Sequence, residues 1–141
     1  RLGLDDTLGE TGRSAADALL AVHRSYVAAL RPVLGQVHAL AHITGGGIAG
    51  NLVRVLPEGV EAVVDPASWP RPALFRFIQE AGRVAEDEMR DVFNLGLGMI
   101  AAVPAASVDA VRAAARAAGD ETWVIGEVRA GSRAVRFAGR G

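Results

Sequence analysis

The sequence predicts one layered domain of the α/β or α+β class. Its length of 141 residues fits a single domain of ordinary size. Short strand-like runs are mixed with segments whose apolar residues recur at helical spacing. A glycine-rich loop at residues 44–47 lies between one such strand and one such helix. Half of the residues are apolar, which permits a sizeable core at this length.

The N-terminal part divides at residue 13. Residues 1–13 contain three glycines and several acidic residues, and we expect a linker or arm, followed by a folded domain over residues 14–141. Ser14 is a predicted N-cap with Asp17 in the first helical turn. Helical spacing continues to Leu30, and Pro32 ends that helix. The pattern places His23 on the solvated face of this helix.

The middle of the chain reads as strand, helix and strand. We expect strands over residues 37–43 and 60–65 with a helix over 47–56 between them, forming a right-handed βαβ unit. Two helices follow. The first begins near Pro72 and ends at Gly82, and the second runs over residues 85–93 with Met89, Val92 and Phe93 facing inward.

The C-terminal part predicts three strands and a helix. The first strand covers residues 99–103, and Ser107 caps a helix over 108–118 that ends at Gly119. A strand at 123–128 pairs with another at 134–137 as a hairpin across Gly131 and Ser132.

Composition excludes several classes of protein. A net charge of −1 gives no electrostatic basis for nucleic acid or an anionic membrane surface. The absence of cysteine excludes disulfides and thiolate metal sites. No apolar run reaches the roughly 18 residues that a membrane-spanning helix needs.

The glycine loop is the main candidate site. Glycines at a helix start leave backbone N–H groups available to an anion, and the absent Cβ lets a phosphate approach. Gly45, Gly47 and Gly50 also satisfy the G-x-G-x-x-G pattern, with Asp65 twenty residues beyond Gly45. Three interpretations stay open at this point: a phosphate site, a dinucleotide site, and a tight turn without a ligand.

Other polar residues give weaker signals. His42 ends a strand beside the loop, where ligands often bind, whereas His38 on the same face lacks a third ligand for a metal, so no metal site is predicted. Asn94, Gly96 and Gly98 indicate either close approach of a ligand to the backbone or tight packing. The acidic run at residues 86–88 is typical of a solvated helix face. Trp69 and Trp123 fit a core or an interface better than a stacking site.

Five spaced blocks resemble the phosphoribosylformylglycinamidine cyclo-ligase (aminoimidazole ribonucleotide synthetase) family. They are Ala41-His42-Ile43-Thr44-Gly45-Gly46-Gly47, Asn51-Leu52-Val53-Arg54-Val55-Leu56-Pro57, Trp69-Pro70-Arg71-Pro72, Glu88-Met89-Arg90-Asp91-Val92-Phe93-Asn94-Leu95-Gly96-Leu97-Gly98-Met99 and Trp123-Val124-Ile125-Gly126-Glu127-Val128. The resemblance spans residues 19–128 and concerns only the C-terminal half of the family. Two departures are Gly50, where the family has glutamate, and residues 22–26, where only Arg24 and Tyr26 match.

The resemblance implies a function and a fold. It implies a cytoplasmic enzyme of purine biosynthesis that uses ATP and Mg²⁺ to close the ring of formylglycinamidine ribonucleotide. It also implies a three-layer α/β/α sandwich with a mixed sheet, partly ferredoxin-like. The ATP site and most of a homodimer interface would lie in an N-terminal domain, so this part alone would be inactive. Related kinases and synthetases of the same superfold, and a non-catalytic phosphate-binding module, are the alternatives.

The resemblance also implies site residues. His42 and Asn94 are the candidates for a catalytic role. The predicted substrate- and phosphate-binding residues are Thr44, Gly45, Gly46, Gly47, Asn51, Gly96 and Gly98.

Overall fold

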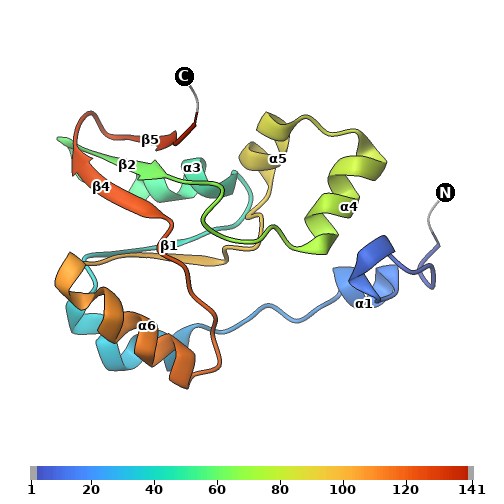
Figure 1. Ribbon diagram of the computed structural model, residues 1–141, viewed down its shortest axis with the longest axis horizontal. Coiled ribbons are helices and arrows are strands. Elements are labelled where there is room, and N and C mark those ends of the chain that lie inside the picture. The colour runs from blue at the N-terminus through green and yellow to red at the C-terminus, as the bar shows by residue number, and fades with distance from the viewer. Residues whose placement is uncertain (1–2, 140–141) are drawn as a thin grey trace.

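The strands form two small sheets in the computed structural model, which describes residues 3–139 (Figure 1). Strand β1 (Ala39–His42) pairs antiparallel with β3 (Met99–Ala102). Strand β2 (Val60–Val64) lies between β4 (Gly126–Ala130), its antiparallel neighbour, and β5 (Ala134–Phe137), its parallel neighbour. The mixed α/β content confirms the predicted class, and the second sheet is itself mixed.

Two predicted strand pairings are wrong. Strands β1 and β2 lie in different sheets, so the expected βαβ unit does not form. Strands β4 and β5 do not form a hairpin, because β2 lies between them. The buried Glu61 of β2 accepts hydrogen bonds from Arg129 of β4 at 2.9 Å and from Arg136 of β5 at 2.8 Å. Such an acidic side chain needs partners, and the arginines supply them from both sides.

The predicted helix over residues 14–30 is broken. Ser14 does cap α1 (Ala15–Leu19), where its Oγ accepts the Asp17 amide at 3.1 Å. Residues 20–26 then run as an open segment to α2 (Val27–Leu30), visible in Figure 1 as the long stretch between α1 and the α6 region. Contacts with distant residues hold this segment, including an ion pair of 3.0 Å between Arg24 and Asp120. Helical spacing alone could not reveal these contacts, because most helix stability comes from tertiary packing.

The remaining helices follow the predicted positions closely. Helix α3 (Gly47–Leu52) continues as a 3-10 turn, η3 (Val53–Val55), and packs on α5 (Glu86–Val92). Helix α4 (Ala73–Gly82) lies against η1 (Gly9–Thr11), and α6 (Val108–Ala117) packs on α2. The other 3-10 turns are η2 (Arg31–Gln36) and η4 (Ala105–Ser107).

Three details of these helices and strands differ from prediction. The Ser107 side chain makes no capping bond, because the η4 turn already precedes α6. Met89 is fully buried as expected, but Val92 is 44% exposed. Strand β4 begins at Gly126 rather than at Trp123. Trp123 and Ile125 precede the strand and pack against the core.

The core lies between the two sheets and α3. Its buried members are Ala41, Ile43, Ile48, Leu52, Leu56, Ala62, Val64, Trp69, Leu97 and Ile100. Trp69 also donates from its indole nitrogen to the Leu95 carbonyl at 3.0 Å, which confirms its predicted place in the core. Leu8 is buried as well, so the segment before α1 packs on the domain; the boundary at residue 13 stays a prediction. Within residues 3–139, no helix is long and apolar enough to cross a membrane.

Candidate functional site

Two glycine-containing segments, residues 42–47 and 94–98, meet at one end of the β1–β3 ladder. His42 and Met99 are direct partners in that ladder, and the Ile43 amide donates to the Gly98 carbonyl at 2.9 Å. The structure therefore brings together the two stretches that the sequence marked separately.

The glycine loop is a tight turn with two exposed glycines. The Gly47 amide closes the turn on the Thr44 carbonyl at 3.3 Å, and Gly46 has the left-handed conformation at φ +93°. Gly45 and Gly46 are exposed, and their amides donate to no acceptor among the described residues. The loop thus offers two adjacent N–H groups to an anion, the arrangement called a nest.

Asn51 explains why these amides face outward. Its buried Nδ2 donates to the carbonyls of Gly47 at 2.7 Å, Gly45 at 3.3 Å and Thr44 at 3.4 Å. In a trans peptide the N–H points away from the carbonyl before it. Holding the Thr44 and Gly45 carbonyls inward therefore turns the Gly45 and Gly46 N–H groups outward. Asn51 acts on the loop, and direct contact with a ligand stays a prediction.

Close packing surrounds three other glycines. A Cβ on Gly47 would overlap the Arg90 carbonyl of α5, and one on Gly98 would overlap the Tyr26 hydroxyl. Gly96 combines φ +102° with ring atoms of Pro72 2.7 Å from the position of a Cβ. Close approach of protein to the backbone accounts for these positions. Their roles in ligand binding stay predictions.

Asn94 shapes the second turn. Its Oδ1 accepts the Gly96 amide at 3.0 Å, and its carbonyl accepts the Leu97 amide at 2.9 Å. Between them, buried Leu95 has φ +51°, a strained conformation for this residue type. The bond from the Trp69 indole to the Leu95 carbonyl holds it there.

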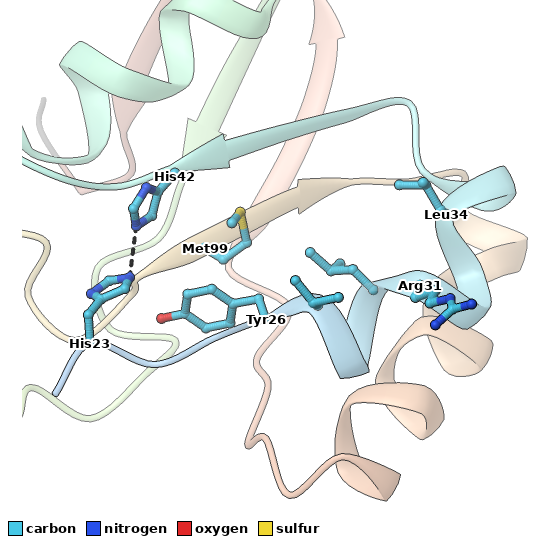
Figure 2. Close-up of a pocket in the computed structure, with 8 residues that line it drawn as sticks. His23, Tyr26, Arg31, Leu34, His42 and Met99 are labelled. Atoms are coloured by element: carbon cyan, nitrogen blue, oxygen red, sulfur yellow. Dashed lines mark hydrogen bonds between the residues drawn. The ribbon is translucent and has the colours of Figure 1, made fainter.

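His42 faces an open apolar groove beside α2 (Figure 2). The groove encloses about 420 Å³ and is lined by His23, Tyr26, Val27, Leu30, Arg31, Leu34, His42 and Met99. The Nε2 atoms of His23 and His42 lie 3.0 Å apart. The prediction that His23 is only solvated is therefore wrong. No local pattern could reveal a contact across 19 residues.

Tyr26, which lines the groove, and Glu86 at the start of α5 both have shifted pKa values. Burial raises the pKa of Tyr26, and Asp120 raises it further, so the hydroxyl stays protonated. Glu86 accepts two hydrogen bonds from Arg71, at 2.6 and 2.9 Å, and these lower the pKa of Glu86 to about 2. Arg90 also pairs with Glu86 at 3.0 Å, so Glu86 is not the purely solvated residue that was predicted.

Neither a metal cluster nor a dinucleotide site follows from this geometry. Within residues 3–139, no group of three or more His, Asp or Glu side chains could hold a metal ion. A dinucleotide fingerprint requires adjacent parallel strands on either side of its helix. Strands β1 and β2 lie in different sheets, which removes that interpretation of Gly45, Gly47, Gly50 and Asp65.

Comparison with known proteins gives the family. A family model described as "AIR synthase related protein, C-terminal domain" matches residues 1–138. The chain belongs to this family. Among curated relatives, a phosphoribosylformylglycinamidine cyclo-ligase from Anaeromyxobacter dehalogenans is 47% identical over 128 residues, covering 89% of this chain and 36% of the relative. One of the same name from Burkholderia cenocepacia is 50% identical over 121 residues, covering 84% and 34%.

Solved structures show the same fold for this family member. The protein tt0281 from Thermus thermophilus superposes with a TM-score of 0.65 at 24% identity, over 94% of this chain and 41% of that one. HypE from E. coli, a hydrogenase maturation protein, gives 0.59 at 25% identity, over 96% and 44%. A thiamine-monophosphate kinase from Stenotrophomonas maltophilia gives 0.54 at 21% identity, over 79% and 33%. The chain thus spans about a third to under half of the length of these relatives and solved structures.

Proposed function

We propose that this chain is the C-terminal domain of a phosphoribosylformylglycinamidine cyclo-ligase. The complete enzyme would use ATP to close formylglycinamidine ribonucleotide to aminoimidazole ribonucleotide in purine biosynthesis. The observation that carries the proposal is the 46–50% identity to several relatives of that name, over most of this chain. The site residues lie inside the matched region, which extends over residues 1–138 of the chain.

The glycine loop would hold an oxyanion of the reaction. The outward N–H groups of Gly45 and Gly46 would donate to a phosphate or to the reacting oxygen, with the exposed Thr44 hydroxyl beside them. Because Asn51 fixes the loop from behind, these donors would be in place before the ligand arrives, which reduces the cost of ordering them.

The second turn would complete the cleft. Gly96 and Gly98 would keep the backbone close to β1, with Asn94 holding the turn. His42, at the β1 end next to the loop, would donate or accept a proton near the reacting group. Asn94 would be the other polar side chain with a catalytic role.

Other parts would come from outside this chain. ATP and Mg²⁺ would bind mainly to an N-terminal domain, and the complete protein would be a cytoplasmic homodimer. This chain alone would bind the ribonucleotide but would lack ligase activity. Within the complete protein, this domain would be a three-layer sandwich that is partly ferredoxin-like.

Ligand binding by the isolated chain is the first test. Isothermal titration with formylglycinamidine ribonucleotide, ATP and NAD should give binding of the ribonucleotide only. Gly45→Pro should abolish it, because proline lacks the N–H that would donate. Ala105→Pro, at the exposed first position of the η4 turn, serves as the control for an added proline. Unchanged affinity of Gly45→Pro would remove the loop from the site.

Activity of a chimera is the second test. This chain replaces the matched region of the Anaeromyxobacter dehalogenans relative, which is 47% identical to it. The chimera should restore growth without purines to a strain lacking its own cyclo-ligase, and the isolated chain should not. A folded chimera that binds ATP but never forms the imidazole ring would overturn the proposal.

A further inference from the structure

The two facing histidines at the groove mouth form a second candidate site. His23 comes from the open segment between α1 and α2, and His42 from the end of β1. Their ring centroids are 4.9 Å apart, their planes are inclined by 63°, and the two Nε2 atoms are 3.0 Å apart (Figure 2). We propose that this pair binds one transition-metal cation of the Cu²⁺ or Ni²⁺ type through both Nε2 atoms.

The separation of the nitrogens fits two ligands on one metal. With metal–nitrogen bonds of about 2.0–2.1 Å, two cis ligands at right angles lie about 2.9 Å apart, close to the distance between these atoms. Tetrahedral coordination would need about 3.3–3.4 Å. Right-angled coordination is typical of Cu²⁺ and Ni²⁺, which also bind imidazole more strongly than the earlier first-row metals. Since Cu²⁺ stands above Zn²⁺ in the affinity order, Cu²⁺ is the first ion to test and Ni²⁺ the second.

The surroundings allow a metal to enter. Both histidines are exposed, so each ring can rotate until its lone pair points at a common centre and water can fill the remaining positions. Met99, the strand partner of His42, lines the same groove and brings a thioether near the pair. Figure 2 places Arg31 toward the opposite end of the groove, away from the imidazoles.

Binding would join two parts of the chain that are distant in sequence. Without metal, a single hydrogen bond links the two rings, and it requires one nitrogen to donate and the other to accept. Coordination would replace that bond with two metal–nitrogen bonds. Residues 20–26 would then be fastened to β1 at the groove mouth.

Titration of the untagged full chain with Cu²⁺ and with Ni²⁺ tests the site directly. We expect one equivalent of either metal to bind, with Cu²⁺ binding more tightly than Ni²⁺. The Cu²⁺ complex should show electron paramagnetic hyperfine coupling to two imidazole nitrogens. His23→Gln and His42→Gln should each weaken binding at least tenfold and remove one coupled nitrogen. The control His38→Gln, an exposed histidine just before β1, should change nothing.

Hydrogen exchange provides an independent readout. Ni²⁺ should slow amide exchange in residues 20–25 of the unaltered chain and have no effect in His23→Gln. Binding that survives in both variants would overturn the proposal, as would the absence of binding at millimolar metal. In that case the pair does no more than share a proton. This test requires neither the ribonucleotide nor turnover, so its result is separate from that of the proposed ligase function.

Discussion

Three consecutive glycines of the loop should respond very differently to alanine. Gly45 has no atom within 4 Å of the position that a Cβ would take, and its φ is not positive. Gly46 has space, with only the Asn51 amide nitrogen at 3.9 Å, but its φ is +93°. Gly47 combines φ +61° with a Cβ position 2.9 Å from the Arg90 carbonyl carbon and closer still to its oxygen.

The expected costs in stability follow from the φ angle of each glycine and from the space available to a Cβ. Gly45→Ala should change the free energy of unfolding by less than about 1 kcal/mol, since an unstrained alanine mainly restricts the unfolded chain. Gly46→Ala should cost about 1–2 kcal/mol for the left-handed conformation alone. Gly47→Ala adds the displacement of α3 from the α5 backbone, about 1–3 kcal/mol more, for a total of about 2–5 kcal/mol.

Urea unfolding followed by far-UV circular dichroism measures all three variants. The urea midpoint should be highest for Gly45→Ala, lower for Gly46→Ala and lowest for Gly47→Ala. The Gly47 variant should lose a large part of the stability of a typical domain, which is about 5–15 kcal/mol. Equal stability of the Gly45 and Gly47 variants would refute the close approach of α3 to α5 on which the reasoning depends.

Three further variants test other parts of the structure. Asn51→Ala should cost about 1–3 kcal/mol, because each of three loop carbonyls loses the donor that Asn51 supplies; an unchanged urea midpoint would contradict this. Met89→Ala should cost about 2–5 kcal/mol, and Val92→Ala, on the exposed side of the same helix, under about 1 kcal/mol; similar midpoints for both would contradict the described burial. Because the pKa of Glu86 is lowered to about 2, its pairing with Arg71 stabilises the fold above the ordinary pKa near 4.5 and is lost as the pH falls toward 2. Allowing for its partial exposure, Glu86→Gln should remove about 1–2 kcal/mol at pH 7 and less at pH 3, and a loss independent of pH would refute the pairing.

Local signals in the sequence predicted most of the elements. Ser14 caps a helix because its hydroxyl reaches an amide three residues away, a contact that needs nothing else from the fold. Gly82 closes α4 at the predicted position. The loop between β1 and α3 was likewise visible, since its glycines lie between two recognisable patterns. Each of these features depends on residues within one or two turns of each other.

Long-range contacts explain the predictions that failed. The helix expected through His23 does not form, because His42 and Asp120 hold residues of that segment in an open conformation. The expected hairpin of β4 and β5 does not form, because β2 lies between these strands. Glu61 of β2 forms an ion pair with one arginine from each neighbouring strand. Local periodicity measures which face of an element is apolar, and it carries no information on which partner covers that face.

The sequence by itself determined the family, the class of fold and the position of the glycine loop. These can be recognised from residue types and short spacings, which do not depend on how distant segments of the chain pack. The tertiary structure alone decided which strands pair, that Asn51 turns the loop amides outward, and that His23 meets His42. These depend on distances between segments far apart in the chain, which are set only when the whole core packs.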